Sequence, residues 1–228
     1  MRIKVWDLPT RLFHWLLFVT VAAALWTGWL GGGWIDWHGR LGLAVLGLLA
    51  FRLVWGVIGS TYARFVEFAP TPGRLVAYLR GHWRGAGHNP LGALSVFALL
   101  GYLSWQAGSG LFSNDDIAYK GPLAGLVSSA TSDRLSGLHR QGLWIILALV
   151  TLHVTAIVVY ALRRKNLVKP MLLGWKEVED PSIASATGGK LWALVLALAI
   201  AAATVWAADG GLLPPPPPPP PAHAVPAW

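Results

Sequence analysis

Two histidines within one strongly apolar segment are the residues best placed to do chemistry in this chain. His139 and His153 lie 14 residues apart in HRQGLWIILALVTLHVTAIVVY. At about 100° per residue, 14 residues return to nearly the same face of an α-helix and span about 21 Å along its axis. Ionisable side chains are costly inside a membrane and mark functional positions there. Two histidines on one face, one near each end of a membrane helix, are what two stacked metal cofactors would require.

The composition requires a membrane environment for such a helix. Of the 228 residues, 55% are hydrophobic and 12% are charged, against about 25% charged in soluble domains. We therefore predict an all-α fold, an integral membrane helical bundle. The chain has no cysteine, which excludes disulfides, thiolate-bound iron–sulfur clusters and c-type haem attachment. The net charge of +8 does not indicate nucleic acid, because the basic residues cluster beside apolar spans.

Five apolar spans have the length of membrane helices. They cover about 12–30, 38–58, 90–112, 136–161 and 191–208, and the first is read as a retained helix rather than a signal peptide. Thirteen basic residues fall on the N-terminal side of the membrane and four on the other, with Arg52 inside a span. The positive-inside rule then predicts a cytoplasmic N-terminus and a periplasmic C-terminus. The segment Pro72–Trp83 is predicted to form an amphipathic helix on the cytoplasmic surface.

This orientation gives each histidine of the spans a depth. His14 and His153 are expected near the cytoplasmic side, and His38 and His139 near the outside. Each pair supplies two imidazoles from different helices at one level, which is the arrangement of a bis-histidine b-type haem. Alone, each histidine could instead be a hydrogen-bonded residue or part of a proton relay. A zinc site is a weaker alternative, because it needs three or four ligands at one point.

Four further residues could serve the same cofactors. Arg52 follows His38 by 14 residues, so it shares that face at the depth of the cytoplasmic pair. It could contact a haem propionate or a quinone, or be a snorkelling arginine at a helix end. Arg40 and Arg140 flank the outer ligands and could reach propionates there, or be ordinary interfacial residues. His88 opens the third span and could handle protons near a quinone, or simply cap the helix.

Several motifs carry a resemblance to a known family: VWDLPTRLFHW at Val5–Trp15, RLVWG at Arg52–Gly56, GHNPLGAL at Gly87–Leu94 and the helix with the two paired histidines. Together they resemble the bacterial cytochrome b561 family, which includes the membrane cytochrome b subunits of nickel–iron hydrogenases. The resemblance covers about Lys4–Gly174. It implies a four-helix core that binds two b haems, with quinone exchange on one side of the electron path. By resemblance, the haem ligands are His14, His38, His139 and His153.

The domain organisation follows from these spans. We expect a di-haem four-helix cytochrome b domain over 1–175, a cytoplasmic linker over 176–189 and a fifth transmembrane helix over 190–208. A proline-rich extracytoplasmic tail, 209–228, completes the chain, and its eight consecutive prolines would form a polyproline II spacer or docking segment. The fifth span and the tail lie outside the shared core, so the resemblance says little about them.

The expected function is electron transfer across the bacterial inner membrane. The chain would connect the quinone pool with a periplasmic redox partner, such as a c-type cytochrome, a dehydrogenase or a hydrogenase, as a subunit rather than a stand-alone enzyme. An alternative is a superoxide oxidase that passes electrons from superoxide to ubiquinone, as some relatives do. The slightly acidic outer face disfavours an anionic substrate and suits a basic partner. A membrane scaffold with structural histidines is the third alternative.

Overall fold

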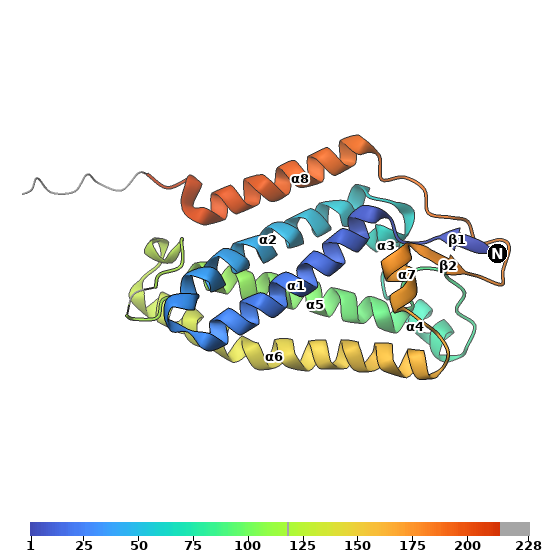
Figure 1. Ribbon diagram of the computed structural model, residues 1–228, viewed down its shortest axis with the longest axis horizontal. Helices are drawn as coiled ribbons and strands as arrows, with labels where there is room; N and C mark the ends of the chain where they lie inside the picture. The colour runs from blue at the N-terminus through green and yellow to red at the C-terminus, as the bar shows by residue number, and fades with distance from the viewer. Residues whose placement is uncertain (118, 215–228) are drawn as a thin grey trace, which may run out of the picture.

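Five long helices dominate the computed structural model, which describes residues 1–117 and 119–214. They are α1 (Leu8–Leu30), α2 (Ile35–Ile58), α5 (Pro90–Leu111), α6 (Ser129–Leu162) and α8 (Leu191–Trp206) (Figure 1). Within this described part of the chain, each of the five, α8 together with the turn that follows it, is long and apolar enough to cross a membrane. The predicted membrane helical bundle is thereby confirmed. His223 and all but the first of the tail's consecutive prolines lie outside the described residues.

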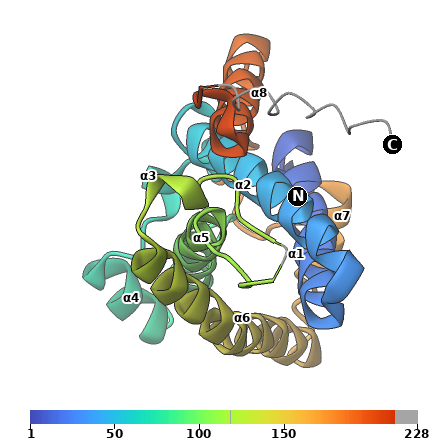
Figure 2. The ribbon, with the colours of Figure 1, turned by 90° about the vertical axis from the view of Figure 1, so that its left-hand side faces the viewer.

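Four of these helices form a bundle, and the fifth lies outside it. Seen from one end, α1, α2, α5 and α6 surround a common centre, while α8 packs on the outer side of α2 (Figure 2). Small residues make the α2–α8 contact: Ala193 and Ala197 are buried, and a Cβ on Gly47 would lie 2.7 Å from Val205 Cγ2. Such close approach is typical of membrane helix pairs. The bundle, and not α8, therefore contains the predicted histidine pairs.

Polar side chains cap the helices and explain why two of them begin earlier than hydropathy predicts. The Asp7 carboxylate accepts from Thr10 N at 2.6 Å, and Ser128 Oγ accepts from Thr131 N at 3.3 Å. These caps start α1 at Leu8 and α6 at Ser129, before the predicted starts near 12 and 136. The extra turns contain polar residues that an apolar-span criterion leaves out, although a side chain at the N-cap stabilises them.

The short elements gather at one end of the bundle, here called the N-terminal end. They are β1 (Arg2–Lys4), a 3₁₀ turn (Thr61–Ala63), α3 (Phe65–Phe68), α4 (Pro72–Leu79), α7 (Val168–Leu173) and β2 (Trp175–Glu177) (Figure 1). β1 and β2 form an antiparallel ribbon with Arg2 opposite Glu177, a small addition that the all-α prediction did not include. The predicted surface helix forms, but it ends at Leu79, just before Gly81, whose φ is +76°.

The segment predicted as a linker, 176–189, is fastened across the N-terminal end. Ala186 N donates to Lys4 O at 2.7 Å, and Thr61 N donates to Thr187 O at 2.9 Å. Tyr62 Oη donates to Ala184 O at 2.6 Å. This chain section therefore joins the start of the protein to the entrance of α8.

The other end of the bundle, here called the distal end, contains fewer elements. They are the 3₁₀ turns Gly32–Trp34 and Ala124–Leu126 and the π-helical turn Ala207–Gly211 after α8. The loop between α5 and α6 folds back onto α6, since Asn114 N donates to Ser136 Oγ at 2.8 Å and Asn114 Nδ2 to Ser132 Oγ at 2.6 Å. Tyr119 of this loop lies against Gly39, the residue that follows His38.

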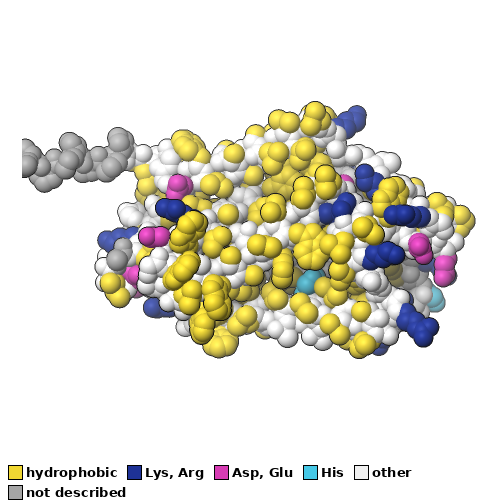
Figure 3. All heavy atoms as spheres, in the orientation of Figure 1, with side chains coloured by type: hydrophobic (Ala, Val, Ile, Leu, Met, Phe, Trp, Pro, Cys, Tyr) yellow, Lys and Arg dark blue, Asp and Glu magenta, His cyan; other side chains and the backbone are white. Residues whose placement is uncertain are grey.

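Side-chain distribution matches a membrane-spanning molecule. Hydrophobic side chains cover the middle of the face in Figure 3, and charged side chains lie toward its two ends. Large apolar side chains are exposed along the spans; Trp29 is 74% exposed and Trp144 71%. Inside the bundle, a core of buried residues includes Leu49, Trp55 and Ile146. The molecule is thus apolar on both its inner and its outer surfaces, as a lipid environment requires.

Candidate functional site

His38 and His139 face each other near the distal end. Their Nε2 atoms are 3.5 Å apart, the ring centroids are 5.7 Å apart and the ring planes cross at 82°. His38 comes from α2 and His139 from α6, so two helices far apart in sequence meet at this point. We call these two residues the distal pair.

Backbone carbonyls fix the protonation of both rings in the distal pair. His38 Nδ1 lies 2.8 Å from Ala24 O, and His139 Nδ1 lies 3.0 Å from Gln106 O. A carbonyl oxygen only accepts, so each Nδ1 carries a proton and donates it. In the neutral rings, each Nε2 then has a lone pair and no hydrogen. The two lone pairs point at one another, an arrangement that needs an electron-pair acceptor between them.

A metal centre with two axial imidazoles satisfies this arrangement. Metal–imidazole nitrogen bonds are about 2.0–2.1 Å long, so two in line span roughly 4 Å. The observed Nε2–Nε2 separation of 3.5 Å is close to that span. No group of three or more His, Asp or Glu side chains that could hold a metal ion occurs among the described residues. The distal pair therefore fits the iron of a haem better than a tetrahedral metal ion.

The second predicted pair, His14 and His153, lies toward the N-terminal end; we call it the N-terminal pair. His153 Nδ1 is 3.2 Å from Ser95 Oγ on α5. His14 Nδ1 is buried and has no hydrogen-bond partner within the described structure. The two rings are close enough for their charges to interact, although no hydrogen bond joins them in the described residues. The structure thus places each predicted pair toward one end of the bundle, but brings only the distal pair into direct contact.

Arg52 is a buried cation beside the N-terminal pair. Only 3% of the residue is exposed, and its guanidinium carbon lies 4.6 Å from the centroid of the Phe65 ring. Its Nη1 has no hydrogen-bond partner in the described part of the chain. A buried guanidinium with a free donor favours an anionic or carbonyl ligand nearby. The predicted contact with a propionate or a quinone would satisfy this donor.

Asp7 interacts with Arg52 electrostatically, but its hydrogen bonds are made with other residues. Besides capping α1, its carboxylate accepts from Trp55 Nε1 at 3.0 Å and from Ser60 Oγ. Asp7 therefore ties the start of α1 to the end of α2 and leaves Arg52 without an ion pair in the described structure. The sequence analysis missed this role. The signal was the Asp-Leu-Pro that begins the first helix, which indicates a cap but not the other two bonds.

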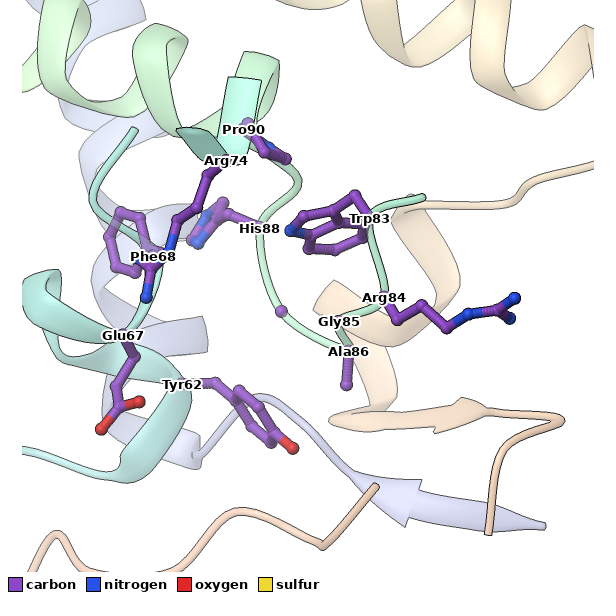
Figure 4. Close-up of a pocket in the computed structure, with 11 residues that line it drawn as sticks. Tyr62, Glu67, Phe68, Arg74, Trp83, Arg84, Gly85, Ala86, His88 and Pro90 are labelled. Carbon is purple, nitrogen blue, oxygen red and sulfur yellow. The ribbon is translucent and has the colours of Figure 1, made fainter. Parts of the chain in front are cut away.

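His88 borders a pocket of about 170 Å³ at the N-terminal end (Figure 4). Its ring lies between Trp6 and Phe68, with centroid distances of 4.7 Å and 4.5 Å. Burial, together with the nearby charges of Arg52, His14 and His153, lowers the pKa of His88 to about 3. The ring is therefore neutral, and its buried Nδ1 has no partner within the described residues. The pocket lining is Tyr62, Glu67, Phe68, Arg74, Trp83, Arg84, Gly85, Ala86, Gly87, His88 and Pro90.

The remaining predicted arginines lie on the surface. Arg40 and Arg140 are both exposed, and the Arg40 guanidinium lies 5.3 Å from the centroid of the Trp37 ring. Both arginines lie within two residues of a distal-pair histidine in sequence. The described contact of Arg40, with the Trp37 ring, is that of an interfacial residue. His82 is exposed, as expected.

Comparison with known proteins places this geometry in a family. The family model described as prokaryotic cytochrome b561 matches residues 5–174. A protein of Rhizobium leguminosarum bv. viciae is 23% identical over 220 residues, which cover 78% of this chain and 90% of the relative. One of Azotobacter vinelandii is 24% identical over 223 residues, covering 78% and 90%. One of Escherichia coli (strain K12) is 23% identical over 193 residues, covering 66% and 80%.

The first two relatives are named "Probable Ni/Fe-hydrogenase B-type cytochrome subunit", and the third "Probable Ni/Fe-hydrogenase 1 B-type cytochrome subunit". No solved structure gives a significant match. The family match covers both histidine pairs, Arg52 and His88, and it ends before the segment 176–189 and α8. The chain belongs to the prokaryotic cytochrome b561 family, and is a multi-pass membrane b-type cytochrome that binds haem b and takes part in electron transport.

Proposed function

We propose that this cytochrome binds two haem b groups and carries electrons across the membrane between the quinone pool and a redox partner on the far side. The observation that carries the proposal is the distal pair, where two Nε2 lone pairs face each other at 3.5 Å with both Nδ1 atoms already donating. His38 and His139 would hold one haem, and His14 and His153 would hold the other. A haem held by two histidines would supply a one-electron couple.

The orientation that suits this function puts the N-terminal end in the cytoplasm and the distal end in the periplasm of a bacterium, across the inner membrane. Support comes from the charge bias, because thirteen of the eighteen Lys and Arg residues belong to segments at the N-terminal end. Lipid would cover the exposed apolar side chains of the spans.

The quinone would react at the N-terminal end, near His88 and Arg52. Quinone chemistry moves protons together with electrons, so a site needs a group that can accept or donate a proton. His88 is neutral and has a free Nδ1, and it borders a pocket beside the N-terminal pair. We propose that His88 passes the proton on through Nδ1 without retaining it, as its lowered pKa requires, and that Arg52 Nη1 orients the quinone oxygen or a haem propionate.

The redox partner would dock on the distal end. The names of the relatives suggest a nickel–iron hydrogenase, and a c-type cytochrome or another periplasmic dehydrogenase would meet the same need. Acidic residues in this region are Asp36, Asp115, Asp116, Asp133 and Asp209. Their charge favours a partner with a basic docking face.

Single histidine variants of the purified full-length protein test the assignment of the haems. His139→Ala should lose the distal haem and keep the other, and His153→Ala should do the reverse. His82→Ala is the matched control, since that histidine is exposed, and it should keep both. Haem content and redox spectra give the result. If His139→Ala and His153→Ala both keep the wild-type haem content, the assignment is wrong.

A quinol assay tests the proposed role of His88 separately. His88→Ala should keep both haems but slow their reduction by a soluble quinol at least tenfold. His82→Ala again serves as the control. An unchanged rate would place quinone chemistry elsewhere in the molecule.

A further inference from the structure

The two rings of the distal pair are held by the same backbone arrangement on two different helices. His38 donates to Ala24 O on α1, and Gly28 follows Ala24 by four residues. His139 donates to Gln106 O on α5, and Gly110 follows Gln106 by four residues. In both cases a carbonyl accepts from the imidazole, and the glycine lies one helical turn further along on the same face.

The glycines are needed because the rings lie against the helix backbone at these points. A Cβ on Gly28 would lie 2.7 Å from His38 Nδ1 and 2.9 Å from its Cε1. A Cβ on Gly110 would lie 3.0 Å from His139 Cε1 and 3.3 Å from its Nδ1. Non-bonded carbon atoms are in favourable contact at about 3.5–4.0 Å, so either methyl group would push the ring away from its carbonyl. The displacement would be larger at Gly28.

We propose that Gly28 and Gly110 are positioning residues for the distal haem ligands. Each glycine lets the Nδ1–Cε1 edge of one imidazole approach the neighbouring helix closely enough to donate from Nδ1 to the carbonyl one turn earlier. The two bonds together set the ring planes 82° apart and hold both Nε2 atoms toward the centre. The inference rests on the proposed haem ligation by His38 and His139.

In the described structure, neither ring of the N-terminal pair donates from Nδ1 to a backbone carbonyl. His153 Nδ1 meets a side-chain hydroxyl of Ser95, and His14 Nδ1 has no partner. A hydrogen bond from Nδ1 to a carbonyl makes imidazole a stronger donor to a metal. The distal haem should therefore depend on the two glycines, while the other haem should not.

Alanine variants at the two glycines test the proposal. Gly28→Ala and Gly110→Ala are compared with Gly101→Ala, a matched control on α5, where a Cβ would meet no atom within 4 Å. The full-length proteins are purified and examined by haem content, by low-temperature EPR of the ferric state and by redox titration. Repeating the EPR in a His153→Ala background, which lacks the other haem, assigns the signal to the distal site.

The proposal predicts altered EPR anisotropy and a raised midpoint potential for the distal haem, because weaker donation stabilises ferric iron less. The effect should be largest in Gly28→Ala, smaller in Gly110→Ala and absent in Gly101→Ala, with the other haem unchanged in all three. Wild-type EPR and potential in both glycine variants would overturn it. If neither variant accumulates, the wild-type signal decides: near-perpendicular rings give a strongly anisotropic low-spin signal, and an ordinary rhombic one overturns the proposal. A wild-type protein without haem would instead overturn the proposed function.

Discussion

The four predicted ligands differ in the hydrogen bonds that their Nδ1 atoms make. In the distal pair, both Nδ1 atoms donate to backbone carbonyls, so Nε2 is the free nitrogen of each ring. In the N-terminal pair, Nδ1 of His14 has no partner in the described structure, while a buried cation, Arg52, lies beside the pair. Ferric haem carries one more positive charge than ferrous haem, so a nearby cation favours the reduced state. The two haems should therefore differ in potential.

Replacing Arg52 by leucine tests the effect of that buried charge. Arg52→Leu should lower the midpoint potential of the N-terminal haem, since the cation that favours its reduced state is gone. We expect a shift on the order of 60 mV, equal to about 1.4 kcal/mol for one electron. Redox titration measures it, with Arg140→Leu as an exposed control. A shift confined to the distal haem would place Arg52 at the wrong end of the molecule.

At the scale of helices, one carboxylate joins two elements of the bundle. Asp7 caps α1 and also accepts from Trp55 Nε1 and Ser60 Oγ at the end of α2. α1 contains His14 and α2 contains Arg52, so this contact sets their relative position. Three donors converge on a carboxylate that is only 8% exposed, and removing it would leave buried donors unpaired.

Asp7→Ala should therefore destabilise the protein more than the loss of an ordinary cap. We expect a decrease of about 2–4 kcal/mol in the free energy of unfolding, from the lost cap and the unpaired donors. Ser128→Ala, which removes the cap of α6, should cost about 1 kcal/mol. Unfolding in detergent, followed by circular dichroism, compares the two. Equal losses would show that the contacts with Trp55 and Ser60 contribute little.

The fifth helix should be dispensable for the cofactors. Among the described residues α8 packs mainly on the outer side of α2, and the four histidines belong to α1, α2 and α6 (Figure 2). Removing residues 190–228 should leave both haems in place and expose the α2 surface around Gly47. Haem content of the purified shortened protein measures this outcome. Loss of either haem would show that α8 is part of the binding core.

Across the whole molecule, the sequence predicted the architecture better than the details of the site. Long apolar spans were enough to predict the bundle, and the spacing of the histidines was enough to predict that His38 and His139 meet, because membrane length and helical periodicity constrain both. The hydrogen bonds from Nδ1 of His38 and His139 could not be predicted, because their acceptors are backbone carbonyls, which no residue type reveals. The sequence also did not predict that the segment 176–189 is hydrogen-bonded across the N-terminal end, since most of those bonds join backbone groups of remote segments.

The orientation in the membrane is a property of the whole chain. If the N-terminal end faces the cytoplasm, a reporter fused after Gly81 or within 180–188 should be active only in its cytoplasmic form. A reporter placed near Asp116 should be active only in its periplasmic form. Paired cytoplasmic and periplasmic reporters at each position make the comparison. Reversed activities would invert the membrane sides of both histidine pairs and of the His88 pocket.

The haem content of the purified full-length protein tests the central claim most directly. A pyridine haemochrome assay, combined with quantitative amino-acid analysis, gives the number of b haems per chain. The two histidine pairs predict two haems in the wild-type protein. A value of one would leave a pair without its cofactor, and a value of zero in folded protein would contradict haem ligation by these histidines altogether.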